Sequence, residues 1–251
     1  MSQTTQPQPS NSSSSTSIPS PPLNLQHTAS GSPYIPLTSR SPHPVFLTHL
    51  FETDAPAMAT ELSDPTLNKA LIAPPTPYTL DDAKWWINNV RTGNTKLPLC
   101  ALRLHAPDST GLLIGGISLA PSEPSSFSHI LKPSSAVSIP KSEPESGNNN
   151  TSSIPEPDTK TNKSVTLDYW LSPNHRQLSI MKPAVSALIS WGIQTCGVTK
   201  IFVIASEDNI ASRSIIESFP QFVRQEGFEW LEWPEKKGGG KRKTLSWVWE
   251  V

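Results

Sequence analysis

The residues that could do chemistry gather where a predicted strand passes into a predicted helix, between positions 165 and 195. A helix that begins directly after a buried strand offers unpaired backbone N–H groups and the positive end of its dipole, a combination that binds phosphate. His175 and Arg176 lie just before this helix, and Lys182 lies in its first turn. A lysine there opposes the dipole unless an anion is bound. The pattern indicates a phosphate site, with a solvated basic turn as the alternative.

The elements that must position this loop follow from hydrophobic periodicity, caps and turn residues. Thr79 with Asp82 resembles a capping box, and Asn209 is placed to cap a later helix. Gly115-Gly116 inside a strand predicts a bulge or a close backbone approach. Strands are predicted over 44–50, 101–105, 112–119, 165–171, 200–205, 222–233 and 244–251, and helices over 54–63, from 79, over 180–195 and after 206. This order predicts an α/β (α+β) fold, with a mixed sheet of about seven strands covered by helices.

Ser, Thr, Pro and Gln dominate two long stretches, 1–43 and 121–163, in a chain of 251 residues that holds 27 Pro. Segments of this composition cannot bury enough apolar surface to offset their ordering entropy. We therefore expect a disordered tail over 1–43 and one domain over 44–251, interrupted by a disordered insertion at 121–163. Such an insertion is tolerable because the cost of closing a loop grows only logarithmically with its length.

Charge and composition argue against several classes of protein. A net charge of −1, from 20 basic and 21 acidic residues, provides no concentrated basic face for a nucleic acid. No apolar run approaches the roughly 20 residues that cross a bilayer, and the first residues do not form a signal peptide. Cys100 and Cys196 are too few and too far apart for a disulfide framework or a metal-ligand set. These features predict a cytoplasmic or nuclear protein with no membrane or nucleic-acid partner and no metal.

The segments that begin at Tyr169, Ile201 and Ala70 resemble those of GNAT superfamily N-acetyltransferases. The sequence YWLSPNHRQLSIMKPAVSALISWG, from Tyr169, is similar to the family's acetyl-CoA pattern Y-W-L-x-P-x-x-R-G-x-G-I-x-T-E-A. IFVIASEDNIASRSIIESF, from Ile201, is similar to the next family segment, which contains N-x-x-S. ALIAPPTPYTLDDAKWWI, from Ala70, resembles the acceptor-side helices of the branch that includes ribosomal-protein N-terminal acetyltransferases. The resemblance implies a GNAT-like fold, acetyl-CoA as co-substrate, and acetyl transfer to a primary amine of a peptide or small molecule.

The resemblance also implies which residues contact acetyl-CoA. Backbone N–H groups near Trp170 and Leu171 would meet the thioester carbonyl. Against the family's phosphate-loop pattern R-x-x-G-x-G/A, which begins here at Arg176, Ser179 replaces the first glycine and Met181 replaces the small residue after it. A catalytically impaired CoA-binding or interaction module is therefore the alternative function. The implied contacts are Trp170, Leu171, Arg176, Gln177, Leu178, Ser179, Ile180, Met181, Asn209 and Ser212.

Three residues are candidates for the catalytic roles that the resemblance implies. Ser212 would protonate the leaving thiolate, although it could instead be a small helix-surface residue. Glu232 is the preferred general base, and Asp168 is the second candidate. Either carboxylate could instead be a solvated surface group.

The sequence says less about the residues that would bind the acceptor amine. Tyr78, His175 and the pair Trp85-Trp86 could line an acceptor groove, although we interpret the tryptophans as core residues. The basic stretch from Lys236 to Lys243 is interpreted as an exposed hairpin connection, with steering of an acidic acceptor as the alternative.

Overall fold

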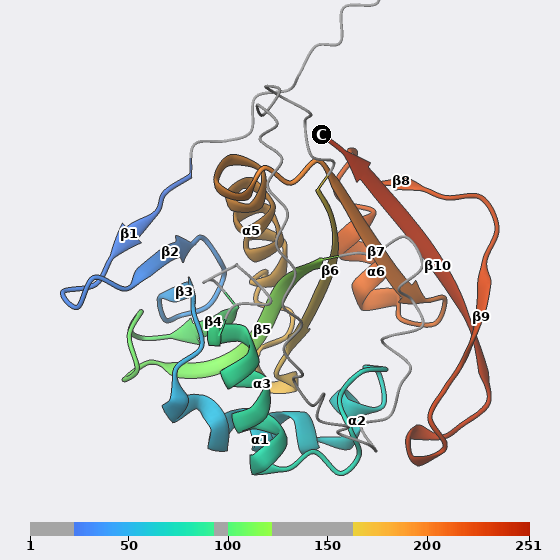
Figure 1. Cartoon of the computed structure of the whole chain (residues 1–251), viewed down its shortest axis with the longest axis horizontal. Helices are drawn as coiled ribbons and strands as arrows, with labels where there is room; N and C mark the ends of the chain where they lie inside the picture. Colours follow the sequence, from blue (N-terminus) through green and yellow to red (C-terminus); the bar gives the residue numbers. More distant parts are fainter. Residues whose placement is uncertain (1–22, 93–99, 122–162) are drawn as a thin grey trace, which may run out of the picture.

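The computed structural model describes residues 23–92, 100–121 and 163–251 (Figure 1). The predicted disorder over 1–22 and 122–162 lies outside these residues. The strands are β1 (Gln26–His27), β2 (Pro33–Leu37), β3 (Val45–Thr48), β4 (Ala101–Leu104), β5 (Leu112–Pro121), β6 (Ser164–Leu171), β7 (Lys200–Ser206), β8 (Val223–Arg224), β9 (Glu229–Glu232) and β10 (Lys241–Glu250). The helices are α1 (Ala55–Ser63), α2 (Pro65–Asn68), α3 (Leu80–Thr92), α5 (Met181–Cys196) and α6 (Ile210–Ile216), with short 3₁₀ turns η1 (Glu52–Asp54), η2 (Pro173–His175) and η3 (Glu235–Lys237).

Ten strands of the described residues form one sheet, in the order β1-β2-β3-β4-β5-β6-β7-β10-β8, and β9 also pairs with β10. In this part of the chain, β6 and β7 are the parallel pair, and the other pairings are antiparallel. The predicted mixed sheet flanked by helices is confirmed. It has more strands than predicted, partly because the segment 222–233 forms two short strands, β8 and β9, instead of one.

The other additional strands come from the segment predicted as a disordered tail. That prediction is wrong for its second half, because β2 pairs with β3 over four residue pairs and β1 pairs with β2. Ile35 is buried in the main core, and the ring of Tyr34 meets Phe46 edge-on at 5.6 Å. Pairing to an existing strand and burial of one apolar side chain therefore outweigh the Ser/Pro-rich composition of 23–43.

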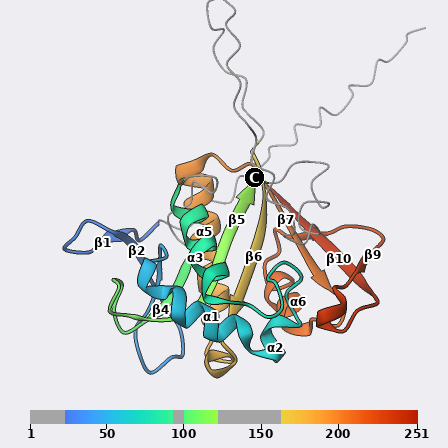
Figure 2. The same ribbon diagram turned by 60° about the horizontal axis from the view of Figure 1, so that its bottom comes forward.

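Neighbouring residues on each strand enter two different cores, because side chains alternate between the faces of a sheet. Leu102 packs in the core that includes α5 and α6, whereas Ala101 packs in the core that includes α1, α2 and α3. The helices thus cover the sheet in two groups, one on each face (Figures 1 and 2). The site discussed below lies where both groups approach β6 and β7.

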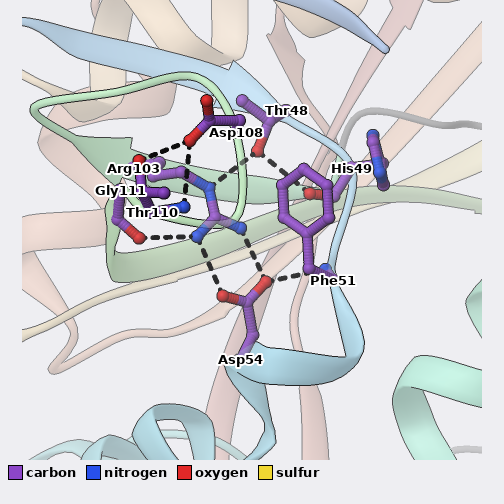
Figure 3. A network of polar contacts seen from close by, with 8 residues as sticks. All are labelled: Thr48, His49, Phe51, Asp54, Arg103, Asp108, Thr110 and Gly111. Carbon is purple, nitrogen blue, oxygen red and sulfur yellow. Dashed lines mark hydrogen bonds and ion pairs between the residues drawn. The ribbon is translucent and has the colours of Figure 1, made fainter. Parts of the chain in front are cut away.

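A fully buried ion pair fixes the position of α1 on the sheet (Figure 3). The guanidinium of Arg103 on β4 donates to both carboxylate oxygens of Asp54, at 2.8 and 2.6 Å, and to the carbonyl oxygen of Gly111 at 2.8 Å. It also lies 4.8 Å from the ring centre of Phe51. Arg103 is 0% and Asp54 4% exposed. Removing one partner would leave the other charge buried without compensation, so this contact is a strong constraint on the α1 face.

The predicted start of α3 is confirmed, but the interpretation of its tryptophans is wrong. The N–H of Thr79 donates to Asp82 at 2.8 Å and the N–H of Asp82 donates to the Thr79 hydroxyl at 3.2 Å, which is the predicted capping box. Trp85 and Trp86 are 64% and 39% exposed. Ala83 and Ile87, four residues apart, take the buried stripe of the helix instead.

The connection between β9 and β10 was predicted to be exposed, and the structure corrects this at Lys237. This residue is 2% exposed, and its amine donates to the carbonyl oxygens of Leu71 and Ile72. Burial lowers the pKa of Lys237 to about 8. The connection therefore holds the segment after α2 against the end of the sheet.

Candidate active site

The parallel strands β6 and β7 separate part-way along their length. They pair only from Ser164 to Thr166 on β6, against Lys200 to Phe202 on β7. Beyond that point β6 continues to Leu171 with its other edge still paired to β5. The two strands visibly diverge in Figure 2. We call this divergence in the middle of the sheet the wedge; along it, the backbone groups of β6 beyond Thr166 do not pair with β7.

Backbone alternation determines which N–H groups of β6 face this wedge. The N–H of Ser172 donates to the carbonyl oxygen of Ile114 at 2.8 Å, on the β5 side. Successive residues of a strand point their backbone groups to opposite edges, so Trp170 also faces β5, while Tyr169 and Leu171 face the wedge. Of the two N–H groups predicted to meet a thioester carbonyl, that of Leu171 is suitably placed, and that of Trp170 is not.

Trp170 instead shapes the neighbouring strand. A Cβ atom on Gly116 would lie 2.5 Å from its indole nitrogen, and one on Gly115 would lie 2.7 Å from its carbonyl oxygen. The register between β4 and β5 also shifts beside Leu102 and Arg103. Both expectations for Gly115-Gly116, a close approach and a bulge, are therefore confirmed.

The loop from Arg176 to Met181 connects the end of β6 to the start of α5, as predicted. Ile180 and Met181 are buried, so their side chains anchor the loop in the core and only their backbone is available to a ligand. Gln177 and Ser179 have φ angles of +63° and +54°. This left-handed region is the one that favours glycine, and a residue with a side chain is disfavoured there by about 1–2 kcal/mol.

Two contacts from Arg40 accompany this unusual backbone. The N–H of Arg40 donates to the carbonyl oxygen of Leu178 at 2.8 Å, and its Nε–H donates to the Ser179 hydroxyl at 2.9 Å. We did not predict any role for Arg40. The signal was present, because it is the only Lys or Arg among residues 1–43.

Lys182 has a different role from the one predicted. Its amine donates to the carbonyl oxygen of Ser218 at 3.4 Å and lies 5.4 Å from the ring centre of Phe219. Ser218 lies just after the end of α6, where a cation is favourable. Lys182 is therefore accounted for by a protein contact and does not indicate a bound anion.

Two buried polar atoms close to the loop lack a hydrogen-bond partner in the described parts of the chain. They are the hydroxyl of Ser172 and Nδ1 of His175. Buried polar groups are nearly always paired, so orphaned ones near a site fit a position that a ligand completes. This observation, the wedge and the loop together fit a CoA-type ligand.

The start of α6 contributes Asn209 and Ser212. Asn209 Oδ1 accepts the N–H of Ser212 at 3.2 Å, so the predicted helix cap is confirmed. The Ser212 hydroxyl lies 2.8 Å from the hydroxyl of Tyr169, which also donates to the Ser212 carbonyl at 3.2 Å. Burial raises the pKa of Tyr169 to about 12, with Asp168 adding to the rise and the bond to Ser212 opposing it. Tyr169 therefore stays protonated at neutral pH. We call its hydroxyl and that of Ser212 the hydroxyl pair.

Asp168 lies on the opposite face of β6 from Tyr169. Trp170 packs with α1 and α3 while Tyr169 packs with α5 and α6, and alternation puts Asp168 on the Trp170 face. It follows Thr166, where pairing with β7 ends. Desolvation raises the pKa of Asp168 to about 6. Asp168 is also reached by solvent on this face, so an incoming amine can approach its carboxyl.

Glu232 is not brought together with the other candidates. It lies on β9, which pairs with β10, and β10 separates it from β7. Its carboxylate is exposed and lies 3.4 Å from the amine of Lys241. The sequence predicted one continuous strand over 222–233. The structure has two, β8 and β9, and the break between them places Glu232 on a strand that pairs only with β10 in the described residues.

Comparison with known proteins agrees with this geometry. Residues 45–219 match the model of the acetyltransferase (GNAT) domain. The chain belongs to the GNAT acetyltransferase family. No curated protein matches the sequence as a relative. As a family member, the chain is an N-acetyltransferase that uses acetyl-CoA, and nothing in the comparisons supports the impaired alternative.

Solved structures share the fold at low sequence identity. RimJ from Mycobacterium smegmatis, in complex with CoA-disulfide, has a TM-score of 0.57 and 15% identity over 87% of each chain. RimL, a ribosomal L7/L12 alpha-N-protein acetyltransferase in complex with coenzyme A, has a TM-score of 0.55 and 13% identity over 86% of this chain and 98% of its own. Spermidine N-acetyltransferase from Vibrio cholerae, with CoA and spermine, has a TM-score of 0.54 and 12% identity, over 81% and 94%.

No helix in the described residues is both long enough and apolar enough to span a membrane.

Proposed function

We propose that this GNAT enzyme acetylates the α-amino group of a protein or peptide N-terminus, with Asp168 as general base and Ser212 as general acid. The observation that carries the proposal is the wedge between β6 and β7, which has a carboxyl on one face of the sheet and a hydroxyl pair on the other. An amine could enter from the α1–α3 face while the thiol leaves on the α6 face. We also propose a cytoplasmic location, which the free thiols Cys100 and Cys196 support.

Acetyl-CoA supplies the thioester carbonyl that the amine attacks. The N–H groups of Leu171 and Tyr169 face the wedge and would bind the carbonyl oxygen as it gains negative charge. Asp168 would accept a proton from the incoming ammonium, directly or through one water molecule, and the neutral amine would then attack the thioester carbonyl. Ser212, hydrogen-bonded to the protonated Tyr169, would donate its proton toward the thiolate.

The loop 176–181 and Asn209 would hold the rest of acetyl-CoA. Backbone N–H groups at the start of α5 and the guanidinium of Arg176 suit the diphosphate. With Oδ1 of Asn209 used by the helix cap, its amide NH₂ is the part that would reach the CoA arm. The hydroxyl of Ser172 is a further candidate, because it is buried and has no partner in the described residues.

The lower pKa of an α-ammonium favours an N-terminus over a lysine as acceptor. Loss of its proton at pH 7, from a pKa of about 8, is unfavourable by roughly 1.4 kcal/mol. For a lysine of pKa about 10.4 the same step is unfavourable by roughly 4.6 kcal/mol. A carboxylate is a weak base and is thus better matched to an N-terminus.

The test is release of CoA thiol by the purified full-length chain with acetyl-CoA and a panel of amines. The panel pairs lysine-free peptides that have a free N-terminus with N-terminally blocked peptides that contain lysine, and adds spermidine. We expect activity above background hydrolysis with free N-termini and at least tenfold less with blocked peptides. Faster turnover of spermidine than of any peptide would show that the acceptor is a polyamine and not an N-terminus. No turnover with any amine would refute the proposal.

A further inference from the structure

Arg40 connects the N-terminal hairpin to the loop that precedes α5. Its backbone N–H and its Nε–H bond two successive residues of that loop, Leu178 and Ser179, at 2.8 and 2.9 Å. The two segments are far apart in sequence and meet only because β2 has joined the sheet. These two bonds join the described N-terminal extension to a segment that is proposed to bind acetyl-CoA.

The loop needs support at this point. Ser179 occupies the position where the family pattern has a glycine, and it keeps the positive φ that a glycine would adopt easily. Gln177 has a positive φ as well. Two residues with side chains in the left-handed region persist only where surrounding contacts hold them. Arg40 makes contacts of the required kind, one to a backbone carbonyl and one to the Ser179 hydroxyl.

Arg40 lies shortly after an element that is anchored in the sheet. It follows β2, which pairs with β3 from Tyr34 to Leu37. Ile35 at the centre of β2 is 3% exposed and packs in the same core as α5. Arg40 makes no ion pair with a carboxylate of the described residues. Its charge is therefore not neutralised by a neighbour.

We propose that Arg40 is a positioning residue for the diphosphate of acetyl-CoA. Through Ser179 it holds the loop 177–179 in the left-handed conformation that glycine provides in the family pattern. The N-terminal extension thereby compensates for the loss of that glycine. This inference rests on the proposed function, because it assumes that the loop binds the diphosphate.

The decisive experiment combines Arg40→Ala with Ser179→Gly. Arg40→Ala should raise the KM for acetyl-CoA and the Kd for CoA about tenfold, with kcat and the KM for the amine changed less than twofold. Ser179→Gly alone should lower the Kd for CoA, because glycine adopts the positive φ of this position without strain. The double variant should recover most of the lost affinity, because glycine adopts positive φ without help from Arg40. Isothermal titration with CoA gives the Kd independently of turnover.

Two controls separate positioning from a general effect on folding. Arg224→Ala removes another exposed arginine, on the edge strand β8, and should change neither constant. S-acetylpantetheine lacks the diphosphate, so its KM should be the same with wild type and Arg40→Ala. A folding defect would instead lower the melting temperature and affect both donors, and Ser179→Gly would not rescue it.

Failure of the proposed function and failure of the role of Arg40 would give different results. If the wild-type chain neither binds CoA nor transfers acetyl, the proposed function is wrong. If wild type is active but Arg40→Ala keeps its Kd for CoA within twofold, or if Ser179→Gly does not rescue the loss, the role of Arg40 is wrong and the function stands.

Discussion

At the scale of single residues, the proposed base Asp168 and the tyrosine that contacts the proposed acid Ser212 lie on opposite faces of β6. Asp168 and Tyr169 are adjacent in sequence and therefore point to opposite faces of β6. Tyr169 contacts Ser212 on α6, while Asp168 shares its face with the core of α1 and α3. A substrate amine and a leaving thiol would thus meet different groups without competing for one.

The proposed base predicts a pH dependence. Below pH about 6 Asp168 is protonated and cannot accept a proton, so kcat/KM of wild type should fall more steeply there than titration of the acceptor amine explains. Asp168→Asn should lower kcat about 100-fold or more and lose the additional slope. The measurement is kcat/KM from pH 5 to 9 with one N-terminal peptide. An unchanged profile would remove Asp168 from the mechanism.

The melting temperature of Asp168→Asn shows whether a loss of activity comes from misfolding. The pKa of Asp168 is higher folded than unfolded, so the folded state binds more protons between about pH 4 and 6. The contribution of Asp168 to stability is therefore present at low pH and lost as pH rises through about 6. Asp168→Asn should consequently not lower the melting temperature at pH 7, and a large drop would mean that the activity loss reflects misfolding.

The hydroxyl pair of Ser212 and Tyr169 predicts that substitutions at these two residues lower kcat by different amounts. Ser212→Ala should lower kcat about tenfold or more, and Tyr169→Phe should lower it less, because it removes only the partner that orients Ser212. The loss in Ser212→Ala should shrink with an acetyl donor whose thiol is more acidic, since such a thiol leaves without protonation. Glu232→Gln is the matched control and should stay within twofold of wild type, because Glu232 is exposed at the sheet edge.

At the scale of elements, one buried ion pair joins the α1 side to the sheet. Arg103 lies on β4 and Asp54 ends η1, directly before α1. Because α1, α2 and α3 share one core, a change at this pair should be felt across the face on which an amine would enter. The sequence predicted α1 and β4 separately, but it contains no signal that pairs these two charges.

Breaking this pair should destabilise the whole domain. Asp54→Ala leaves the guanidinium of Arg103 buried without its carboxylate, and we expect a loss of about 3–5 kcal/mol in the free energy of unfolding. Asp108→Ala removes a nearby, partly exposed carboxylate that, among the described residues, bonds only Thr110 in its own turn, and should lose no more than about 1 kcal/mol. Urea denaturation followed by fluorescence measures both. Equal losses would contradict the buried ion pair.

At the scale of the molecule, the long insertion joins β5 and β6 at the end away from the wedge. Pro121 pairs with Val165 there, whereas Leu171, near the loop, pairs with Gly115 at the other end. The strands on both sides of the insertion were predicted correctly, and their register explains why a long segment can be accommodated between them.

Shortening the insertion should therefore preserve the enzyme. Replacing residues 122–162 by Gly-Ser-Gly still closes a hairpin between two paired residues, and a shorter loop closes at lower entropic cost. We expect kcat/KM within about threefold of wild type and a melting temperature at least as high. Circular dichroism and the thiol-release assay measure these, and a tenfold loss of activity would show that the insertion contributes to the site.

Local features of this protein were determined by the sequence alone. The caps at Thr79 and Asn209, the close packing at Gly115-Gly116 and the strand–loop–helix after Tyr169 were predictable because each depends on residues within a few positions. The family resemblance rested on such local patterns, and the domain match confirms it.

Tertiary structure alone decided which distant residues meet. The contact of Arg40 with Ser179, the pairing of Tyr169 with Ser212 and the exclusion of Glu232 depend on strand order, register and divergence across the whole sheet. Short segments carry no signature of these contacts, because a side chain's partner across a sheet is set by the packing of all the strands between them.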